Sequence, residues 1–215
     1  MILYTDRKDA GKCLAQRLLK ENLIDPIVLA IPNGGVIVGL EIAKALNCPL
    51  ELIVVKKLPI PENPEAGFGA IAHDNTLILN RALIDELEIS EEKIQELVKD
   101  VLGKIKERLE RYGIKNEFPY IKDKTAILVD DGLASGVTME AAISIINKYR
   151  PKSIIVAVPT ASGYAFRKIS PLVYKIVCPD VRRHPHFSVA TVYQFWHDVS
   201  DNEVKTLLNM EGRCI

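Results

Sequence analysis

The sequence predicts an α/β protein with a doubly wound, mainly parallel five-stranded sheet. Three observations predict this class. Five short runs are apolar at most positions, which is typical of strands buried on both faces of a parallel sheet. Each run stops at a turn or loop that contains Gly, Pro or Asp, and helical patterns alternate with the runs. The five expected strands are residues 27–31, 51–55, 127–129, 154–158 and 173–177.

The N-terminal part predicts a helix, a strand and a second helix. Asp6 is a suitable N-cap, and apolar side chains recur at helical spacing from there to about residue 21. Pro26 then restarts the chain into the strand 27–31. The turn Pro32-Asn33-Gly34-Gly35 ends that strand, and a helical pattern follows over residues 36–46.

The next part contains a strand, a loop and a long helix. The strand 51–55 closes with Lys56 and Lys57, for which a solvated strand end is the ordinary interpretation. Residues 58–76 are so rich in Pro and Gly that we expect a flexible loop. Ser90 then caps a long inserted helix with one apolar face, which ends near Tyr112. We interpret this helix as scaffolding or as a dimer contact.

The most informative stretch is residues 127–138, Ile-Leu-Val-Asp-Asp-Gly-Leu-Ala-Ser-Gly-Val-Thr. Its pattern predicts a buried strand that delivers a loop of small residues to the start of a helix. Unpaired N–H groups at a helix N-terminus, with the hydroxyls of Ser135 and Thr138, can bind a phosphate. Asp130 and Asp131 suit hydroxyls or a hydrated cation instead. The two neighbouring sites together describe a phosphorylated ribose.

The remaining chain contains two more strands and a tail. A polar turn at 159–163 and a short helix separate the strands 154–158 and 173–177. The tail, residues 178–215, is irregular, holds the single tryptophan and ends in a helix that begins with a capping box. His184 and His186 are spaced like a metal pair, but Pro185 between them and the lack of a third ligand favour a loop.

Composition excludes several classes of protein. A length of 215 residues suits one domain, and 28 basic against 28 acidic residues leave no net charge to attract nucleic acid or an anionic membrane. No apolar run approaches the length that spans a bilayer, so we expect a soluble, cytoplasmic protein. Four cysteines lie far apart at positions 13, 48, 178 and 214, which favours reduced thiols over a zinc or redox site.

Residues 127–138 resemble the ribose-5-phosphate signature of the type I phosphoribosyltransferases. In that family two acids contact the ribose hydroxyls, and a loop of small residues wraps the 5-phosphate. The resemblance implies that Asp130 and Asp131 are catalytic, orient the ribose and act indirectly at a metal. It implies a phosphate loop made of Gly132, Leu133, Ala134, Ser135, Gly136, Val137 and Thr138. An ordinary strand-to-helix turn in another α/β protein is the alternative.

The first Gly-Gly turn is similar to the pyrophosphate-binding loop of the same family. The resemblance assigns Asn33, Gly34, Gly35 and Lys56 to pyrophosphate binding, and a tight strand-to-helix turn is the alternative explanation of the two glycines. Many family members carry Arg or Lys where Asn33 stands, which is a departure. We therefore expect Lys57 to supply the missing positive charge as pyrophosphate leaves.

The resemblance also predicts a lid and a hood. In the family a mobile loop at the position of 58–76 closes over the active site and excludes water. Glu62 and Glu65 lie in it, and Glu65 is our candidate general base, although exposed loop charge is the ordinary interpretation of both. The region 178–215 corresponds to a hood over the acceptor. Its aromatic candidates for stacking on the acceptor are Phe187, Tyr193, Phe195 and Trp196, and packing in the hood's own core is the alternative for all four.

The implied activity is transfer of the 5-phosphoribosyl group from 5-phosphoribosyl 1-diphosphate (PRPP) to a nitrogen acceptor, with Mg²⁺ and release of pyrophosphate. Members that act on 6-oxopurines carry an Asp where Ala134 stands, which disfavours such a base. The family also implies a homo-oligomer, as a dimer. A non-catalytic sensor of PRPP or a nucleotide is the alternative. A dinucleotide-binding domain is a weaker one, because Gly34, Gly35 and Gly39 do not complete its fingerprint.

Overall fold

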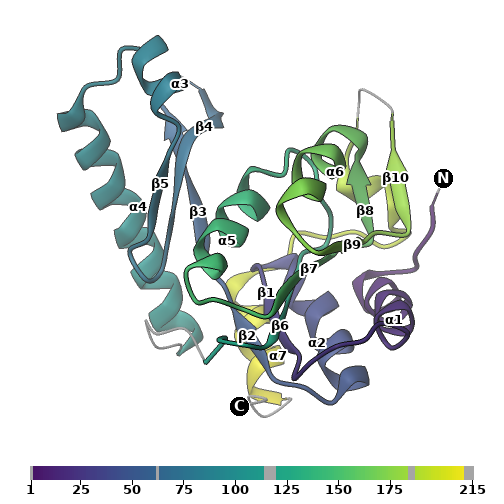
Figure 1. The fold of residues 1–215 in the computed structure, drawn as a ribbon. Coiled ribbons are helices and arrows are strands. Elements are labelled where there is room, and N and C mark those ends of the chain that lie inside the picture. Colours follow the sequence, from purple (N-terminus) through teal and green to yellow (C-terminus); the bar gives the residue numbers. More distant parts are fainter. Residues whose placement is uncertain (1, 62, 114–119, 184–186, 211–215) are drawn as a thin grey trace. The chain divides into compact units, whose positions relative to one another are not determined.

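The computed structural model describes residues 2–61, 63–113, 120–183 and 187–210, without the side chains of residues 63–66. The chain forms two compact units (Figure 1). The first unit comprises Met1–Ile53 and Pro119–Ile215, and the second comprises Val54–Phe118.

The first unit is built on a five-stranded parallel sheet, which confirms the predicted fold class. Its strands, in spatial order, are β2 (Leu50–Leu52), β1 (Ile27–Ala30), β6 (Thr125–Val129), β7 (Ser153–Ala157) and β9 (Lys175–Val177). Every residue of β1 and β6 is buried, as their apolar sequences predict. Ala30 pairs with Val129, so β1 and β6 end at the same level of the sheet. The loops that follow these two strands therefore lie side by side.

Helices complete the first unit. They are α1 (Arg7–Leu18), α2 (Gly34–Leu46), α5 (Val137–Asn147), α6 (Gly163–Ile169) and α7 (Asp201–Met210), with two 3₁₀ turns, η1 (Ser170–Leu172) and η2 (Val189–Val192). The cap predicted at Asp6 is confirmed, because its side chain accepts a hydrogen bond from the Asp9 N–H. Gly11 of α1 packs against α2, and a Cβ there would lie 2.8 Å from the carbonyl oxygen of Val38.

The polar turn expected at 159–163 is partly a strand, so that expectation was wrong. β8 (Thr160–Ser162) pairs in parallel with β10 (Asp180–Arg182). The loop after β6 lies on the other side of β8: the Leu133 N–H donates to the Thr160 carbonyl, and the Ser162 N–H donates to the Leu133 carbonyl. A strand this short is stabilised only by partners distant in sequence, which the local pattern does not reveal.

The second unit contains a three-stranded antiparallel sheet and two helices. The strands are β3 (Val55–Ile60), β4 (Asn63–Ala72) and β5 (Leu77–Leu79), and the helices are α3 (Arg81–Glu86) and α4 (Glu91–Tyr112). The inserted long helix is confirmed, with Ser90 as its N-cap. The predicted strand 51–55 is divided, because β2 ends at Leu52 and Val55 begins β3 in the other sheet.

The expectation that residues 58–76 lack regular structure is wrong, because strands β3 and β4 occupy most of this segment, and the role of the segment as a lid stays a prediction. The register shifts around Pro59, which is how a sheet accommodates a residue without an N–H. A Cβ on Gly69 would lie 2.5 Å from the Ile78 carbonyl oxygen, so this glycine permits the close approach of β4 and β5. Leu58 and Phe68 are buried in one cluster with the apolar face of α4.

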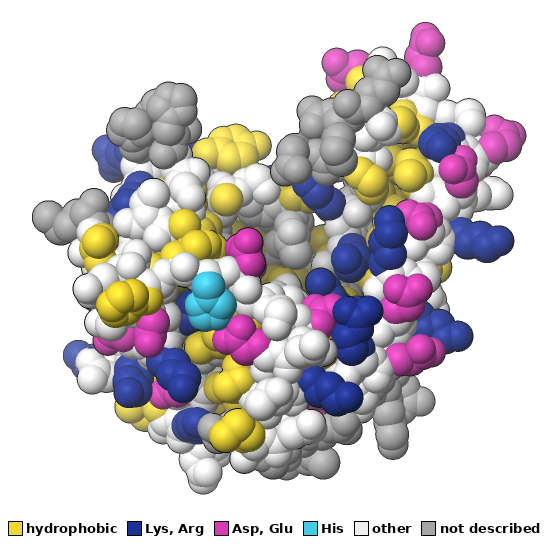
Figure 2. All heavy atoms as spheres, turned by 180° about the vertical axis from the view of Figure 1, so that it is seen from behind, with side chains coloured by type: hydrophobic (Ala, Val, Ile, Leu, Met, Phe, Trp, Pro, Cys, Tyr) yellow, Lys and Arg dark blue, Asp and Glu magenta, His cyan; other side chains and the backbone are white. Residues whose placement is uncertain are grey.

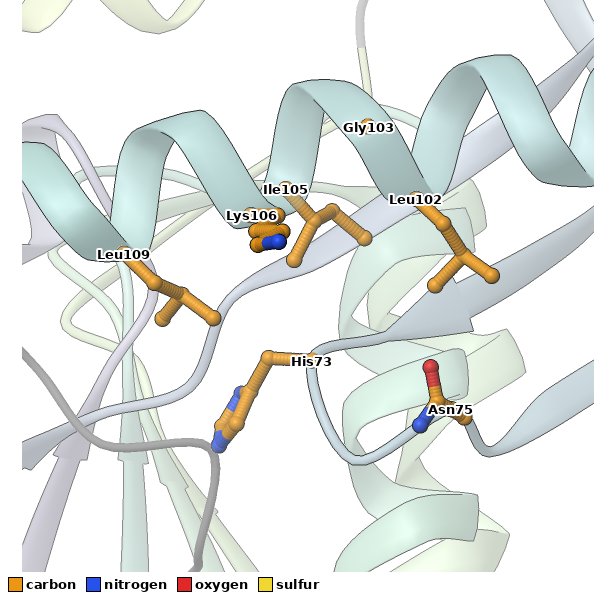
Figure 3. Close-up of a pocket in the computed structure, with 7 residues that line it drawn as sticks. All are labelled: His73, Asn75, Leu102, Gly103, Ile105, Lys106 and Leu109. Atoms are coloured by element: carbon orange, nitrogen blue, oxygen red, sulfur yellow. The ribbon is translucent and has the colours of Figure 1, made fainter.

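His73 fills the interior of the second unit beside α4 (Figure 3). Its side chain lines a cavity of about 190 Å³ with Leu102, Ile105 and Leu109. The Val54 N–H donates to Nδ1 over 3.3 Å, so the neutral ring carries its proton on Nε2. Burial lowers the pKa of His73. We interpret this histidine as a structural group.

The surface carries mixed charge. Figure 2 shows acidic and basic side chains interspersed over the face seen there, in agreement with equal numbers of the two kinds. Among the described helices, none has the length and apolar character needed to cross a membrane.

Candidate functional site

The candidate site begins where β1 and β6 end. Asp130 and Asp131 follow the last residue of β6, and the turn containing Asn33 follows β1. The Ile31 N–H donates to the Val129 carbonyl over 2.9 Å, which extends the pairing of the two strands into their loops. The structure thus brings together two segments that the sequence analysis had assigned to ribose and to pyrophosphate.

Two glycines allow these loops to touch. A Cβ on Gly34 would lie 1.9 Å from Oδ2 of Asp131, and one on Gly35 would lie 2.9 Å from the Cα of Asp130. A side chain at position 34 would displace the Asp131 carboxylate, and one at position 35 would displace the backbone of Val129 and Asp130. The Gly-Gly pair therefore has a packing role in addition to any ligand it binds.

Arg7 is a site residue that sequence reasoning missed. Its Nε donates to Oδ2 of Asp131 over 2.8 Å, and its Nη1 donates to the His197 carbonyl over 2.9 Å. The guanidinium carbon lies 3.9 Å from the centroid of the Trp196 ring, which is cation–π geometry. The Arg7 side chain is only 5% exposed. The position of Arg7 at the start of the predicted helix was a signal in the sequence. A cation in the first turn of a helix is unfavourable beside the helix dipole, which suggests that the residue has another role.

The positive charge near Asp130 and Asp131 does not offset the effect of burial on their pKa values. Burial, followed by the neighbouring Asp131 charge, raises the pKa of Asp130 well above its usual range. Burial also raises the pKa of Asp131, although Arg7 opposes the shift. Oδ1 of Asp130 accepts the Asp131 N–H over 2.8 Å. Such a pair favours ligands that donate hydrogen bonds or bring positive charge.

The loop from Gly132 to Thr138 divides into an inner and an outer part. Gly132 and Gly136 are held inside the fold: a Cβ on Gly132 would lie 2.4 Å from a methyl of Val189, and Gly136 has a φ of +76°. Leu133 is buried, and its N–H and carbonyl both bond to β8, so its backbone is already engaged.

Ala134 and Ser135 form the exposed outer part of this loop. Their N–H groups donate no hydrogen bond within the described residues. Val137 and Thr138 open α5, and the Val137 N–H lies 3.5 Å from Oγ of Ser135. This arrangement offers N–H groups and hydroxyls to an anion.

Asn33 has a structural partner in the C-terminal region. Its Nδ2 donates to the Val199 carbonyl over 2.7 Å and to Oδ1 of Asp201 over 3.1 Å. The amide therefore ties the turn after β1 to the start of α7. The peptide bond between Pro32 and Asn33 is cis. The side chain gives α2 no cap.

The four aromatic candidates of the hood lie in different surroundings. Tyr193 is buried and donates its hydroxyl to the Asp131 carbonyl over 2.6 Å. Trp196 lies on Arg7, with its ring 5.4 Å from that of Tyr193. Phe195 is 64% exposed, and Phe187 lines a cavity beside Ala134 and Ser135. Two of these rings therefore support the Asp131 segment, and a role of the four residues at the acceptor stays a prediction.

Several predicted residues lie elsewhere or outside the description. Lys56 and Lys57 are half-buried in β3 of the second unit. Glu65 is in β4, and its side chain lies outside the described residues, as do Glu62, His184 and His186. The roles of Lys56, Lys57 and Glu65 stay predictions. Within the described part of the chain, no group of three or more His, Cys, Asp or Glu residues could hold a metal ion.

Comparison with known proteins shows what the chain is similar to. A family model described as phosphoribosyl transferase domain matches residues 4–196. A Mycobacterium tuberculosis protein, named provisionally as a phosphoribosyl transferase, is 32% identical over 213 residues, which are 99% of this chain and 48% of that protein. The chain thus spans about half the length of the curated relatives it matches.

Solved structures show the same fold. The crystal structure of TT1426 from Thermus thermophilus has a TM-score of 0.83 and 30% identity, covering 96% of this chain and 98% of that chain. A purine phosphoribosyltransferase from Pyrococcus horikoshii shares the fold with a TM-score of 0.50 and 18% identity, over 84% of this chain and 88% of that chain. The match of the family model over residues 4–196 shows that the chain belongs to the phosphoribosyl transferase domain family.

Proposed function

We propose that the protein transfers the 5-phosphoribosyl group from PRPP to a nitrogen acceptor and releases pyrophosphate. The observation that carries this proposal is the meeting of three features at the ends of β1 and β6. These features are the Asp130–Asp131 pair, the exposed loop that opens α5, and the Gly34–Gly35 turn that opens α2.

The ribose would be oriented by the two acids. Ribose hydroxyls donate hydrogen bonds, and carboxylates with raised pKa values gain from such donors. Arg7 holds Oδ2 of Asp131 and so acts as a positioning residue that directs the other oxygen toward the ligand. The carbonyl of Asp131 is fixed from the other side by the hydroxyl of Tyr193.

The 5-phosphate and the diphosphate of PRPP would each be bound at a helix N-terminus. The 5-phosphate suits the N–H groups of Ala134 and Ser135 together with the first turn of α5. Pyrophosphate suits the first turn of α2, where Asn33 provides no side-chain cap. Lys57 is the cation that we expect to neutralise the leaving group.

Magnesium fits this donor set in a limited way. Mg²⁺ usually binds one or two carboxylates and takes its remaining ligands from water and substrate phosphates. Asp130 and Asp131 are the carboxylates that would hold it, directly or through water, and they lie in a site short of positive charge. When bound, the ion would neutralise the charge that develops on the diphosphate.

The reaction itself needs little covalent help from the protein. The acceptor nitrogen forms a bond to C1 of the ribose, while the bond from C1 to the diphosphate oxygen breaks and pyrophosphate leaves with the electron pair. The proton lost by the acceptor passes to a base, for which Glu65 is the candidate. Positioning and neutralisation of charge supply most of the catalysis. A cytoplasmic location and a homodimer stay predictions.

The test is pyrophosphate release from PRPP with magnesium across a panel of bases and amines. Asp130→Asn combined with Asp131→Asn is expected to abolish PRPP binding, and urea unfolding of the same variant checks that it is folded where binding is measured. Asp123→Asn is the matched control, because Asp123 is an exposed acid of the same unit whose positive φ suits Asn. No PRPP binding by the unaltered protein would refute the proposal. Binding without turnover on any acceptor would identify a PRPP sensor instead.

A further inference from the structure

A second cavity lies beside the outer part of the phosphate loop. Its volume is about 440 Å³, a size common among small-molecule sites. The lining includes Ser135, Tyr164, Arg167, Arg182, Arg183 and Phe187. α6, β8 and β10, which border it, are neighbours in Figure 1. Sequence analysis had assigned no role to the arginines.

The cavity is strongly basic. Three arginines line it, and no carboxylate of the described residues does. Arg182 is held by Asp180, with 2.7 Å from Nε to Oδ2, and its Nη1 donates to the Thr191 hydroxyl. Neither Arg167 nor Arg183 pairs with a carboxylate within the described part of the chain. Like charges gathered in a concave site attract an anion.

Lys168, the next residue of α6 after Arg167, differs from it in being paired with an acid. The Nζ of Lys168 lies 2.6 Å from Oε2 of Glu140 on α5. Arg167, one residue earlier, lines the cavity instead. One short helix therefore carries one neutralised cation and one that is available to a ligand.

Besides the arginines, two aromatic side chains line the cavity. Tyr164 is 64% exposed, and Phe187 is half-buried. An exposed ring in a small cavity is suited to stacking on a planar ligand. Guanidinium groups bind carboxylate and phosphate oxygens through paired hydrogen bonds.

The cavity shares a wall with the phosphate loop. The Ser162 hydroxyl donates to the Ala134 carbonyl over 2.6 Å, and Leu133 bonds to β8. Ala134 and Ser135 belong both to the loop and to the cavity lining. A ligand in the cavity therefore lies next to the position proposed for the 5-phosphate.

We propose that this cavity binds a planar small molecule that carries a carboxylate group, through Arg167 and Arg183. The assignment of that molecule as the acceptor rests on the proposed function. A planar anion bound as a regulator would use the same chemistry, so the experiment distinguishes the two sources.

The experiment uses probes that differ only in charge. Binding of pyridine-3-carboxylate is compared with that of pyridine-3-carboxamide, and binding of uracil-6-carboxylate with that of uracil, by calorimetry or ligand-observed NMR. In the unaltered protein, at least one carboxylate is expected to bind about tenfold or more tightly than its neutral counterpart. Arg167→Gln combined with Arg183→Gln is expected to remove that preference.

Lys168→Gln is the matched control, because it removes one positive charge from the same helix without changing the cavity lining. It is expected to keep the preference for the carboxylate. The proposal is overturned if neither carboxylate binds, if charged and neutral probes bind equally, or if the double Arg variant keeps the preference.

Adding PRPP and magnesium distinguishes acceptor from regulator. Consumption of the carboxylate with release of one pyrophosphate identifies the acceptor, and binding without consumption identifies a regulator. Since probe binding is measured without PRPP, it remains informative even if PRPP does not bind. Failure of the proposed function is therefore distinguishable from failure of this inference.

Discussion

Replacing Arg7 by Met tests whether the buried ion pair supports the site. The pair joins atoms 2.8 Å apart, with side chains 5% and 16% exposed. At an effective dielectric constant of about 20, the Coulomb attraction is about 6 kcal/mol, and desolvation of both groups offsets much of it. Removing one partner leaves a buried, unpaired charge. We therefore expect Arg7→Met to lower the free energy of unfolding by about 3–5 kcal/mol.

The second variant shows whether the unpaired charge is the cause. Adding Asp131→Asn to Arg7→Met removes the stranded charge and is expected to recover about 1–3 kcal/mol. The deficit of Arg7→Met should also narrow as pH falls, because protonation neutralises Asp131, whose pKa is already raised. Further loss of stability in the double variant would refute the reasoning.

The assay is urea unfolding of both single variants and the double variant, which completes a double-mutant cycle. Arg17→Met is the matched control, because Arg17 is an exposed arginine of the same helix. It should change the free energy of unfolding by about 0.5 kcal/mol or less. PRPP affinity measured alongside should fall for Arg7→Met and not for Arg17→Met.

Three further predictions concern packing, pH and the turn after β1. Gly34→Ala should abolish PRPP binding measured by calorimetry, because the added Cβ would overlap the Asp131 carboxylate. Gly103→Ala is the control: nothing lies within 4 Å of its added Cβ, so it should raise the free energy of unfolding by about 1 kcal/mol. The pKa of His73 is lowered from 6.5 in the folded protein, so below about pH 6.5 the unfolded chain binds more protons than the folded one. The free energy of unfolding should therefore fall as the pH falls below that value. His73→Gln should reduce this decline in urea unfolding at about pH 7 and about pH 5, and an unchanged decline would contradict it. Asn33→Arg should destabilise the fold by about 1–3 kcal/mol in the same assay, because the Asn33 amide bonds to Val199 and Asp201 are lost, and unchanged stability would show that those bonds contribute little.

The sequence by itself determined the parallel sheet and the phosphate-loop candidate. Strands buried on both faces must be apolar throughout, so β1 and β6 are visible in the residue pattern. Asp130, Asp131 and the loop to Thr138 are contiguous, so their grouping needs no knowledge of the fold. The cap at Asp6 and the long helix α4 are likewise local features, and both are confirmed.

Only the tertiary structure decided which distant groups meet. Arg7 reaches Asp131 across 124 positions of the chain, and no local pattern encodes that pairing. The segment 58–76 was mistaken for a loop because its strands are stabilised by partners on other strands and by α4, and its Pro and Gly residues mark bulges and close approaches. The hood aromatics separate for the same reason: an aromatic residue is equally suited to a ligand, a core or a guanidinium. Contacts between distant residues, made by burial and charge in three dimensions, select among these uses.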